Sequence, residues 1–144
     1  MASLRYAAGG NAFGLGDILW KASGGSTIKA VLVDSGAYTV SAAHSNLSDI
    51  PAAARSSNYG ATDQTLTLID AASDGELDAN DISFTSLSGA PSFEAIVLYK
   101  STGVEATSTL LYYIDTATSG LPTTAGANTV NVAWNNGANK IAKL

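Results

Sequence analysis

Apolar residues recur along the chain in short runs that glycine, proline and serine interrupt, and the runs are rich in β-branched and aromatic residues. This pattern is typical of strands joined by turns. Residues 28–34 form one almost entirely apolar run, which predicts a strand buried on both faces. The two most hydrophobic runs, residues 93–100 and 109–115, are separated by a short loop and predict neighbouring antiparallel strands at the centre of a sheet.

Three further runs alternate polar and apolar residues, which predicts strands with one buried face. They are residues 65–70, 82–85 and 129–134. The dipeptide Asn136-Gly137 follows the last of them and favours a type I′ turn. We therefore expect a hairpin whose second strand is residues 140–144.

Long helical periodicity is missing, although residues 13–20 and 46–55 could each form a short helical turn. The pattern as a whole predicts an all-β fold, a single antiparallel β-sandwich or barrel-like domain of about seven to eight strands. We expect this domain to comprise residues 17–144 and an extended amino-terminal arm to comprise residues 1–16.

Charged residues make up only 13% of the 144 residues, against about 25% in an ordinary soluble domain. Seven basic residues against twelve acidic ones give a net charge of −5 and cannot form a basic stripe, so we expect no nucleic-acid partner. The absence of cysteine excludes disulfides, thiol nucleophiles and zinc ribbons. No apolar run approaches the roughly 20 residues that span a bilayer, and residues 1–11 lack the apolar core of a secretory signal, so we expect no membrane association.

One acidic cluster invites a metal hypothesis, because residues 70–81 contain five carboxylates. Aligned to a twelve-residue calcium loop that starts at Asp70, the cluster has Ala72 at the third position and Asp81 where a bidentate glutamate is required. We therefore interpret the segment as a solvated turn at Asp74-Gly75 and expect no metal site.

Catalytic chemistry finds little support in the sequence. His44 is the sole histidine, and no Gly-x-Ser-x-Gly elbow accompanies it. Glu94 and Asp115 lie in or at the end of the strongest strands, where we expect them to point outward rather than to form a carboxylate pair. We expect no catalytic residue, no cofactor and no enzymatic activity. Trp134 is expected in the core, whereas for Trp20 the sequence does not decide between the core and an exposed surface.

Three stretches in the second half of the chain are distinctive, namely residues 93–108, 113–116 with 120–122, and 132–144. In these segments the chain resembles a family of small virion structural proteins of tailed bacteriophages, and residues 28–38 and 47–51 fit that family more loosely. These motifs correspond to predicted strands and turns and include no catalytic group.

The resemblance implies a component of the phage particle. We expect a capsid decoration, or cement, protein that binds and stabilises the assembled shell of the major capsid protein. Such proteins are typically β-rich homo-oligomers, often homotrimers, on the capsid surface of a virion that is assembled in the host cytoplasm. The alternative is a tail or fibre component that binds the host surface. A surface poor in charge suits a permanent assembly, where ordering and desolvating long charged side chains is costly.

Residues 1–16 depart from the family pattern and are expected to form an arm that clamps neighbouring capsid subunits. Its expected partner-binding anchors are Leu4, Arg5, Tyr6 and Phe13, to which Trp20 is added, because aromatic and arginine residues often carry interface energy. The alternative for the same segment is a disordered tail.

Overall fold

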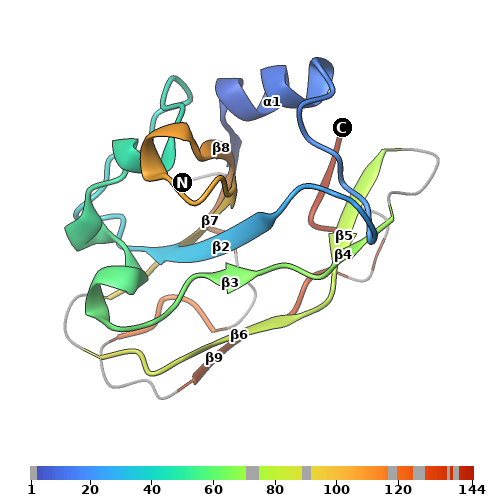
Figure 1. Ribbon diagram of the computed structural model, residues 1–144. Coiled ribbons are helices and arrows are strands. Elements are labelled where there is room, and N and C mark those ends of the chain that lie inside the picture. Colours follow the sequence, from blue (N-terminus) through green and yellow to red (C-terminus); the bar gives the residue numbers. More distant parts are fainter. Residues whose placement is uncertain are drawn as a thin grey trace.

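A computed structural model describes residues 3–70, 75–88, 92–116, 120–124, 129–135, 137 and 140–144. Within these ranges the chain is β-rich, as predicted, and contains one α-helix (Figure 1). The described residues contain ten strands, more than the expected seven to eight, and these pair antiparallel in three sheets. No helix in these ranges is long and apolar enough to cross a bilayer.

The largest sheet has five strands. Their order is β1 (Leu4–Arg5), β8 (Thr109–Ile114), β7 (Ala95–Lys100), β2 (Ile28–Val33) and β3 (Gln64–Thr65). A three-stranded sheet has the order β10 (Ala142–Lys143), β5 (Glu76–Ala79) and β4 (Leu68–Ile69), and the third sheet pairs β6 (Ile82–Thr85) with β9 (Thr129–Val132). The helix is α1 (Ala7–Gly14), and four 3₁₀ turns are η1 (Leu47–Asp49), η2 (Ala52–Ala54), η3 (Ser56–Tyr59) and η4 (Glu105–Thr107).

The predicted central strands are confirmed, because β7 pairs with β8 on one side and with β2 on the other (Figure 1). The register of β7 with β8 shifts after the pair Leu98 and Tyr112, since Tyr99 lies opposite Leu110. Leu111 is therefore the extra residue of a β-bulge. As a result the consecutive residues Leu111 and Tyr112 pack into the same core. Leu110 and Tyr113 pack into the core on the opposite face of the sheet.

One face of the five-stranded sheet, here called the turn-covered face, packs against residues that are not in strands. Val31 of β2 and Val97 of β7 lie in its core together with Tyr38, Ile50 and Ala54. The last three belong to the segment between β2 and β3, which contains the turns η1 to η3. The hydrophobic effect drives this burial. Single antiparallel bridges, Val33 with Arg55 and Asn46 with Thr109, also join the segment to the strands of the sheet.

The opposite face, here called the strand-covered face, packs against the two smaller sheets. Leu32 and Leu98 contribute to its core from the large sheet, Leu68 and Leu77 from the three-stranded sheet, and Phe84 from the two-stranded sheet. The five-stranded sheet is thus buried on both faces, which explains why β2 reads as a continuous apolar run.

The expected extended arm is wrong for residues 3–16. Leu4 pairs with Tyr113 across β1 and β8, and the Tyr6 N–H donates to the Leu111 carbonyl at 3.0 Å. Tyr6 is fully buried, and α1 follows directly. The helix lies against β8 through Gly9, whose missing side chain permits the approach to the β8 backbone. A tertiary contact therefore stabilises a segment whose glycines disfavour a helix.

Two other local predictions need correction. The hairpin around Asn136-Gly137 is wrong, because β9 pairs with β6 whereas β10 pairs with β5. Asn136 itself lies outside the described residues. The helix at the amino terminus is Ala7–Gly14 rather than residues 13–20. The second predicted helical segment is present as the short 3₁₀ turns η1 and η2, the latter capped by Pro51.

Candidate functional site

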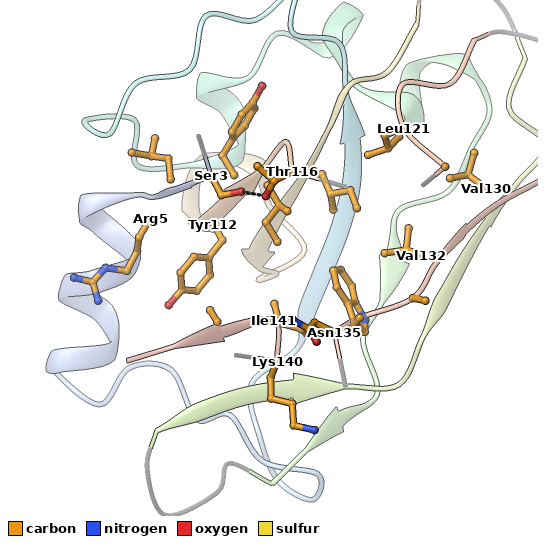
Figure 2. Close-up of a pocket in the computed structure, with 18 of the residues that line it drawn as sticks. Ser3, Arg5, Tyr112, Thr116, Leu121, Val130, Val132, Asn135, Lys140 and Ile141 are labelled. Carbon is orange, nitrogen blue, oxygen red and sulfur yellow. Dashed lines mark hydrogen bonds between the residues drawn. The ribbon is translucent and has the colours of Figure 1, made fainter. Parts of the chain in front are cut away.

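A groove of about 810 Å³ lies where the three sheets meet (Figure 2). Leu4 of β1, Val132 of β9 and Ala142 of β10 all line it. In the part of the chain that the structure describes, β1, β9 and β10 are each an end strand of their own sheet. End strands therefore border the groove, and Ile96 of β7 and Tyr112 of β8 also line it from the interior of the five-stranded sheet.

The floor of the groove is apolar and its margin is polar. Ile114, Val130, Val132 and Trp134 are among the apolar lining residues. The Trp134 indole N–H donates to the Asn80 carbonyl at 3.1 Å, which fixes the ring in the groove wall. This predicted core tryptophan is indeed buried, with 7% of its surface exposed.

Arg5 and Lys140 supply positive charge to the groove, and the described lining residues include no carboxylate. Arg5 is exposed, and the ammonium of Lys140 lies 3.4 Å from a carboxylate oxygen of Asp78, which does not line the groove. The Ser3 and Thr116 hydroxyls hydrogen-bond each other at 2.8 Å at the groove margin (Figure 2). Burial raises the pKa of the Tyr112 phenol in the groove, and the nearby Arg5 guanidinium opposes that rise.

The structure brings two of the five predicted anchors, Leu4 and Arg5, to this groove. Phe13 is half-buried, with its ring 6.5 Å from that of Tyr112. The other two cannot contact a partner in this conformation. Tyr6 is fully buried and its hydroxyl lies 3.1 Å from that of Tyr38, and Trp20 is buried with its indole N–H donating to a carbonyl in β5. Hydrophobic burial therefore overrides the interface role expected for these two aromatic side chains.

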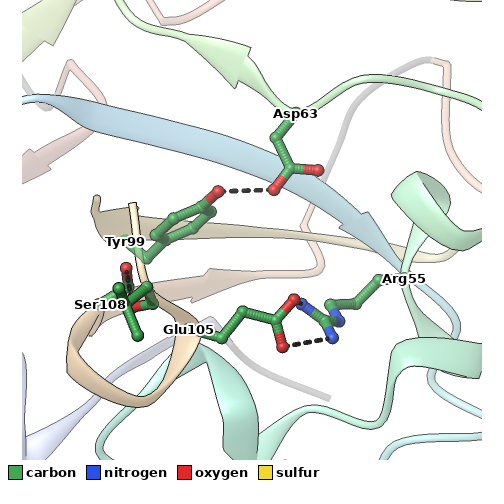
Figure 3. A network of polar contacts seen from close by, with 6 residues as sticks. Arg55, Asp63, Tyr99, Glu105 and Ser108 are labelled. Carbon is green, nitrogen blue, oxygen red and sulfur yellow. Dashed lines mark hydrogen bonds and ion pairs between the residues drawn. The ribbon is translucent and has the colours of Figure 1, made fainter. Parts of the chain in front are cut away.

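A second candidate is a polar network beside a small cavity of about 210 Å³ on the turn-covered face (Figure 3). Arg55, only 5% exposed, binds both carboxylate oxygens of Glu105 at 2.8 and 3.0 Å. The Tyr99 hydroxyl donates to Asp63 at 2.5 Å. Glu105 is in η4, so the ion pair fastens the loop between β7 and β8 to the turn between η2 and η3.

The two carboxyl groups of this network titrate in opposite directions. Burial raises the pKa of Asp63, although the hydrogen bond from Tyr99 and the charge of Arg55 oppose it. The hydrogen bonds from Arg55 hold the pKa of Glu105 below its ordinary value. Lys29 also lines the cavity, so positive and negative groups balance. Asp63 accepts the hydrogen bond of the Tyr99 hydroxyl, and Arg55 and Glu105 bind each other, so we interpret the arrangement as a structural network.

The remaining sequence candidates are dispersed. His44 accepts or donates through Nδ1 to the Tyr38 hydroxyl at 2.7 Å and contacts no serine hydroxyl in the described hydrogen bonds. Asp70 accepts from the Ala22 N–H and Asp81 from the Trp134 N–H, so the acidic cluster serves separate backbone groups. Within the described ranges no three acidic, histidine or cysteine residues gather into a potential metal site. Asp74 lies outside those ranges.

Glu94 also has a local structural role. Its carboxylate accepts hydrogen bonds from the N–H and hydroxyl of Ser35 at 2.9 and 3.2 Å, and from the Ser92 hydroxyl. Burial raises its pKa, but these hydrogen bonds outweigh burial and leave the pKa below its ordinary value. The carboxylate therefore fixes the turn that follows β2.

Neither a protein-family model nor a curated protein matches this chain.

Proposed function

We propose that the chain is a virion structural protein of a tailed bacteriophage, a capsid decoration protein that binds the assembled shell of the major capsid protein. The observation that carries this proposal is the position of the phage-like segments. The longest of them, residues 93–108, comprises β7 and the loop that η4 fastens to the turn-covered face. A resemblance in framework segments supports a shared fold and a binding role rather than a shared catalytic centre.

The surface offers a second line of support. Several large apolar side chains are exposed, and four of them stand out because more than half of their surface meets solvent. They are Leu15 at 70%, Val104 at 58%, Leu144 at 56% and Leu19 at 51%. Single exposed apolar residues are ordinary. In a chain with only 13% charged residues, however, they suit a protein that spends its working life in contact with others.

We also propose that the three sheets act together as one sandwich-like unit. Leu32, Leu77 and Phe84 come from three different sheets and share one hydrophobic core. A shared core couples the sheets, so that the domain unfolds as a whole. Such a unit is suited to bearing load between capsid subunits.

Stabilisation of the shell would follow from mass action. A protein that binds the assembled lattice and not its separated subunits shifts the equilibrium toward the lattice. A homotrimer would engage several subunits at once, and multivalency turns weak contacts into strong attachment. The proposed location is the capsid surface of the virion, reached during assembly in the host cytoplasm.

The test is the copy number of this chain in purified virions of the phage that encodes it, measured by quantitative mass spectrometry against the major capsid protein. Hundreds of copies, in a simple ratio to the shell subunit, are expected for a decoration protein. A handful of copies would overturn the decoration role in favour of a tail or fibre component. Complete absence would overturn the virion role.

A further inference from the structure

We propose that the groove between β1, β9 and β10 binds an extended segment of a partner protein, one that carries apolar and acidic side chains. The proposal depends on the proposed function only for the identity of the partner, which would then be the major capsid protein. The chemistry of the segment is inferred from the groove itself.

The first argument is the apolar floor. The groove has a volume of about 810 Å³, and its walls include Val130, Val132, Trp134 and Ile141. Volumes of this size are typical of sites that bind a ligand rather than of packing defects. Apolar side chains of an incoming segment would be removed from water there, which favours binding.

The second argument is charge. The chain as a whole carries a net charge of −5, yet the described lining of the groove contains Arg5 and Lys140 and no carboxylate. Asp78, outside the lining, offsets part of the charge of Lys140, so the positive charge of the groove depends mainly on Arg5. An acidic segment would therefore be attracted to the groove, whereas a basic one would be repelled by it. Arg5 lies beside α1 and Lys140 beside β5 (Figure 2). Because Arg5 is exposed, a carboxylate can approach its guanidinium without losing all its water.

The third argument is an open strand edge. Tyr6 donates its N–H toward β8, and Leu4, two residues earlier, faces the same way opposite Tyr113. Because main-chain groups alternate along a strand, the N–H and C=O of Arg5 point away from β8. Arg5 also lines the groove. An extended segment that lies beside β1 would exchange a pair of main-chain hydrogen bonds with Arg5, as in other cases of strand addition.

These features together specify the pattern of the segment. Side chains of an extended peptide point alternately to opposite sides. A segment that alternates apolar and acidic residues would direct its apolar side chains to the floor and its carboxylates to Arg5 and Lys140 at the margin. We therefore choose, as the probe, a capped seven-residue peptide that alternates valine with glutamate, and as its control the same peptide with lysine in place of glutamate.

The experiment is a titration of the isotope-labelled protein with each peptide, followed by ¹H–¹⁵N spectra and amide hydrogen exchange. At about 1 mM peptide, the glutamate peptide should shift the amides of Leu4, Arg5 and Val132 and slow the exchange of the Arg5 amide. The lysine peptide should shift none of them. No shifts with the glutamate peptide, equal shifts with both peptides, or shifts confined to another surface would each overturn the proposal.

Charge reversal supplies a matched test. Arg5→Glu should weaken binding of the glutamate peptide by about tenfold, whereas Lys21→Glu makes the same change at an exposed residue outside the groove and should leave binding unaltered. Equal weakening in both variants would show a net-charge effect and overturn a groove site. Unfolding curves of both variants confirm that each is folded under the conditions of the titration.

The outcome is separable from that of the proposed function. Peptide binding at the groove with no copies in virions would retain the groove and overturn the phage role. Hundreds of copies in virions with no peptide binding would retain the decoration role and overturn the groove as its contact.

Discussion

The two faces of the five-stranded sheet are covered in different ways. The turn-covered face is closed by short 3₁₀ turns whose side chains are tied down by hydrogen bonds and by the ion pair of Arg55 with Glu105. The strand-covered face is closed by two small sheets that rely on apolar packing. The first arrangement leaves a cavity of about 210 Å³, and the second leaves a groove of about 810 Å³.

This difference shows how a fold can combine a rigid side with a receptive one. Turns leave many main-chain N–H and C=O groups without partners in a helix or sheet, and each needs a hydrogen bond when it is buried. Where turns cover a face of a sheet, nearly all of these groups must therefore be hydrogen-bonded individually. Pairing within a sheet satisfies the main-chain groups between neighbouring strands, but the outward groups of an end strand have no partner in that sheet. The receptive surface therefore lies where the end strands of the sheets meet.

The largest expected effect on stability is at α1, the helix that packs against β8. In Gly9→Ala, the new Cβ would lie 2.7 Å from both the Leu110 carbonyl oxygen and the Leu111 Cα. Because backbone cannot yield as a side chain can, we expect the free energy of unfolding to fall by about 3 kcal/mol in urea titrations. Gly14→Ala, in the same helix with no atom within 4 Å, should be neutral or stabilising. Equal losses would contradict the close contact of α1 with β8.

The next effect compares the packing of the two faces directly. Val97→Leu adds a methylene to the turn-covered face, where Val97 is fully buried, and should cost about 2 kcal/mol by overpacking. Val132→Leu makes the same change at a residue that lines the groove, and should cost less than about 0.5 kcal/mol because the groove has room. Thermal or urea unfolding measures both. Similar costs would show that the groove wall is as tightly packed as the opposite face.

A smaller effect distinguishes the ion pairs of the two faces. Glu105→Gln leaves the side chain of Arg55, 6% exposed, without its carboxylate, and we expect a loss of about 1 kcal/mol. Glu76→Gln affects a pair in which the nitrogen of Lys143 lies 3.9 Å away and its side chain is 45% exposed, so water replaces the interaction and the loss should be near zero. The test is whether Glu105→Gln lowers the free energy of unfolding more than Glu76→Gln does, whatever the size of each loss.

The smallest effect is on the pH dependence of stability. Burial raises the pKa of Asp63 in the folded protein, so its contribution to stability is complete below the unfolded pKa and is lost as the pH rises through the folded pKa. Asp63→Asn should therefore gain stability relative to the parent between about pH 3.5 and about pH 7. Glu105→Gln should do the reverse, because the lowered pKa of Glu105 gives stability that is lost as the pH falls. Urea midpoints at the two pH values test both signs.

The sequence predicted those parts of the fold that local pattern determines. The apolar run of β2 and the paired runs of β7 and β8 identified the centre of the large sheet, since a strand buried on both faces must be apolar throughout. The amino-terminal segment was missed as structure because β1 has two residues and α1 is rich in glycine. Its conformation depends on β8, which lies far away in sequence.

The candidate site was predictable only in part, for the same reason. Leu4 and Arg5 were selected as anchors from residue type alone, and they line the groove. Tyr6, selected on the same ground, directly follows β1 and is fully buried in the turn-covered core. The groove and the Arg55 network join residues from separate strands and turns, so no spacing of residues along the chain predicts them. The hairpin predicted from Asn136-Gly137 was wrong because β9 pairs with β6 and β10 pairs with β5, rather than with each other.

The pairing of β1 with β8 also constrains the order in which segments can fold during synthesis. Leu4 is synthesised before its partner Tyr113, which follows roughly 5 to 20 seconds later at ordinary elongation rates. An eight-residue helix with three glycines does not persist alone during that interval. The segment of β1 and α1 is therefore made well before it can fold, and a nascent chain stalled before β8 would leave this segment exposed to other proteins.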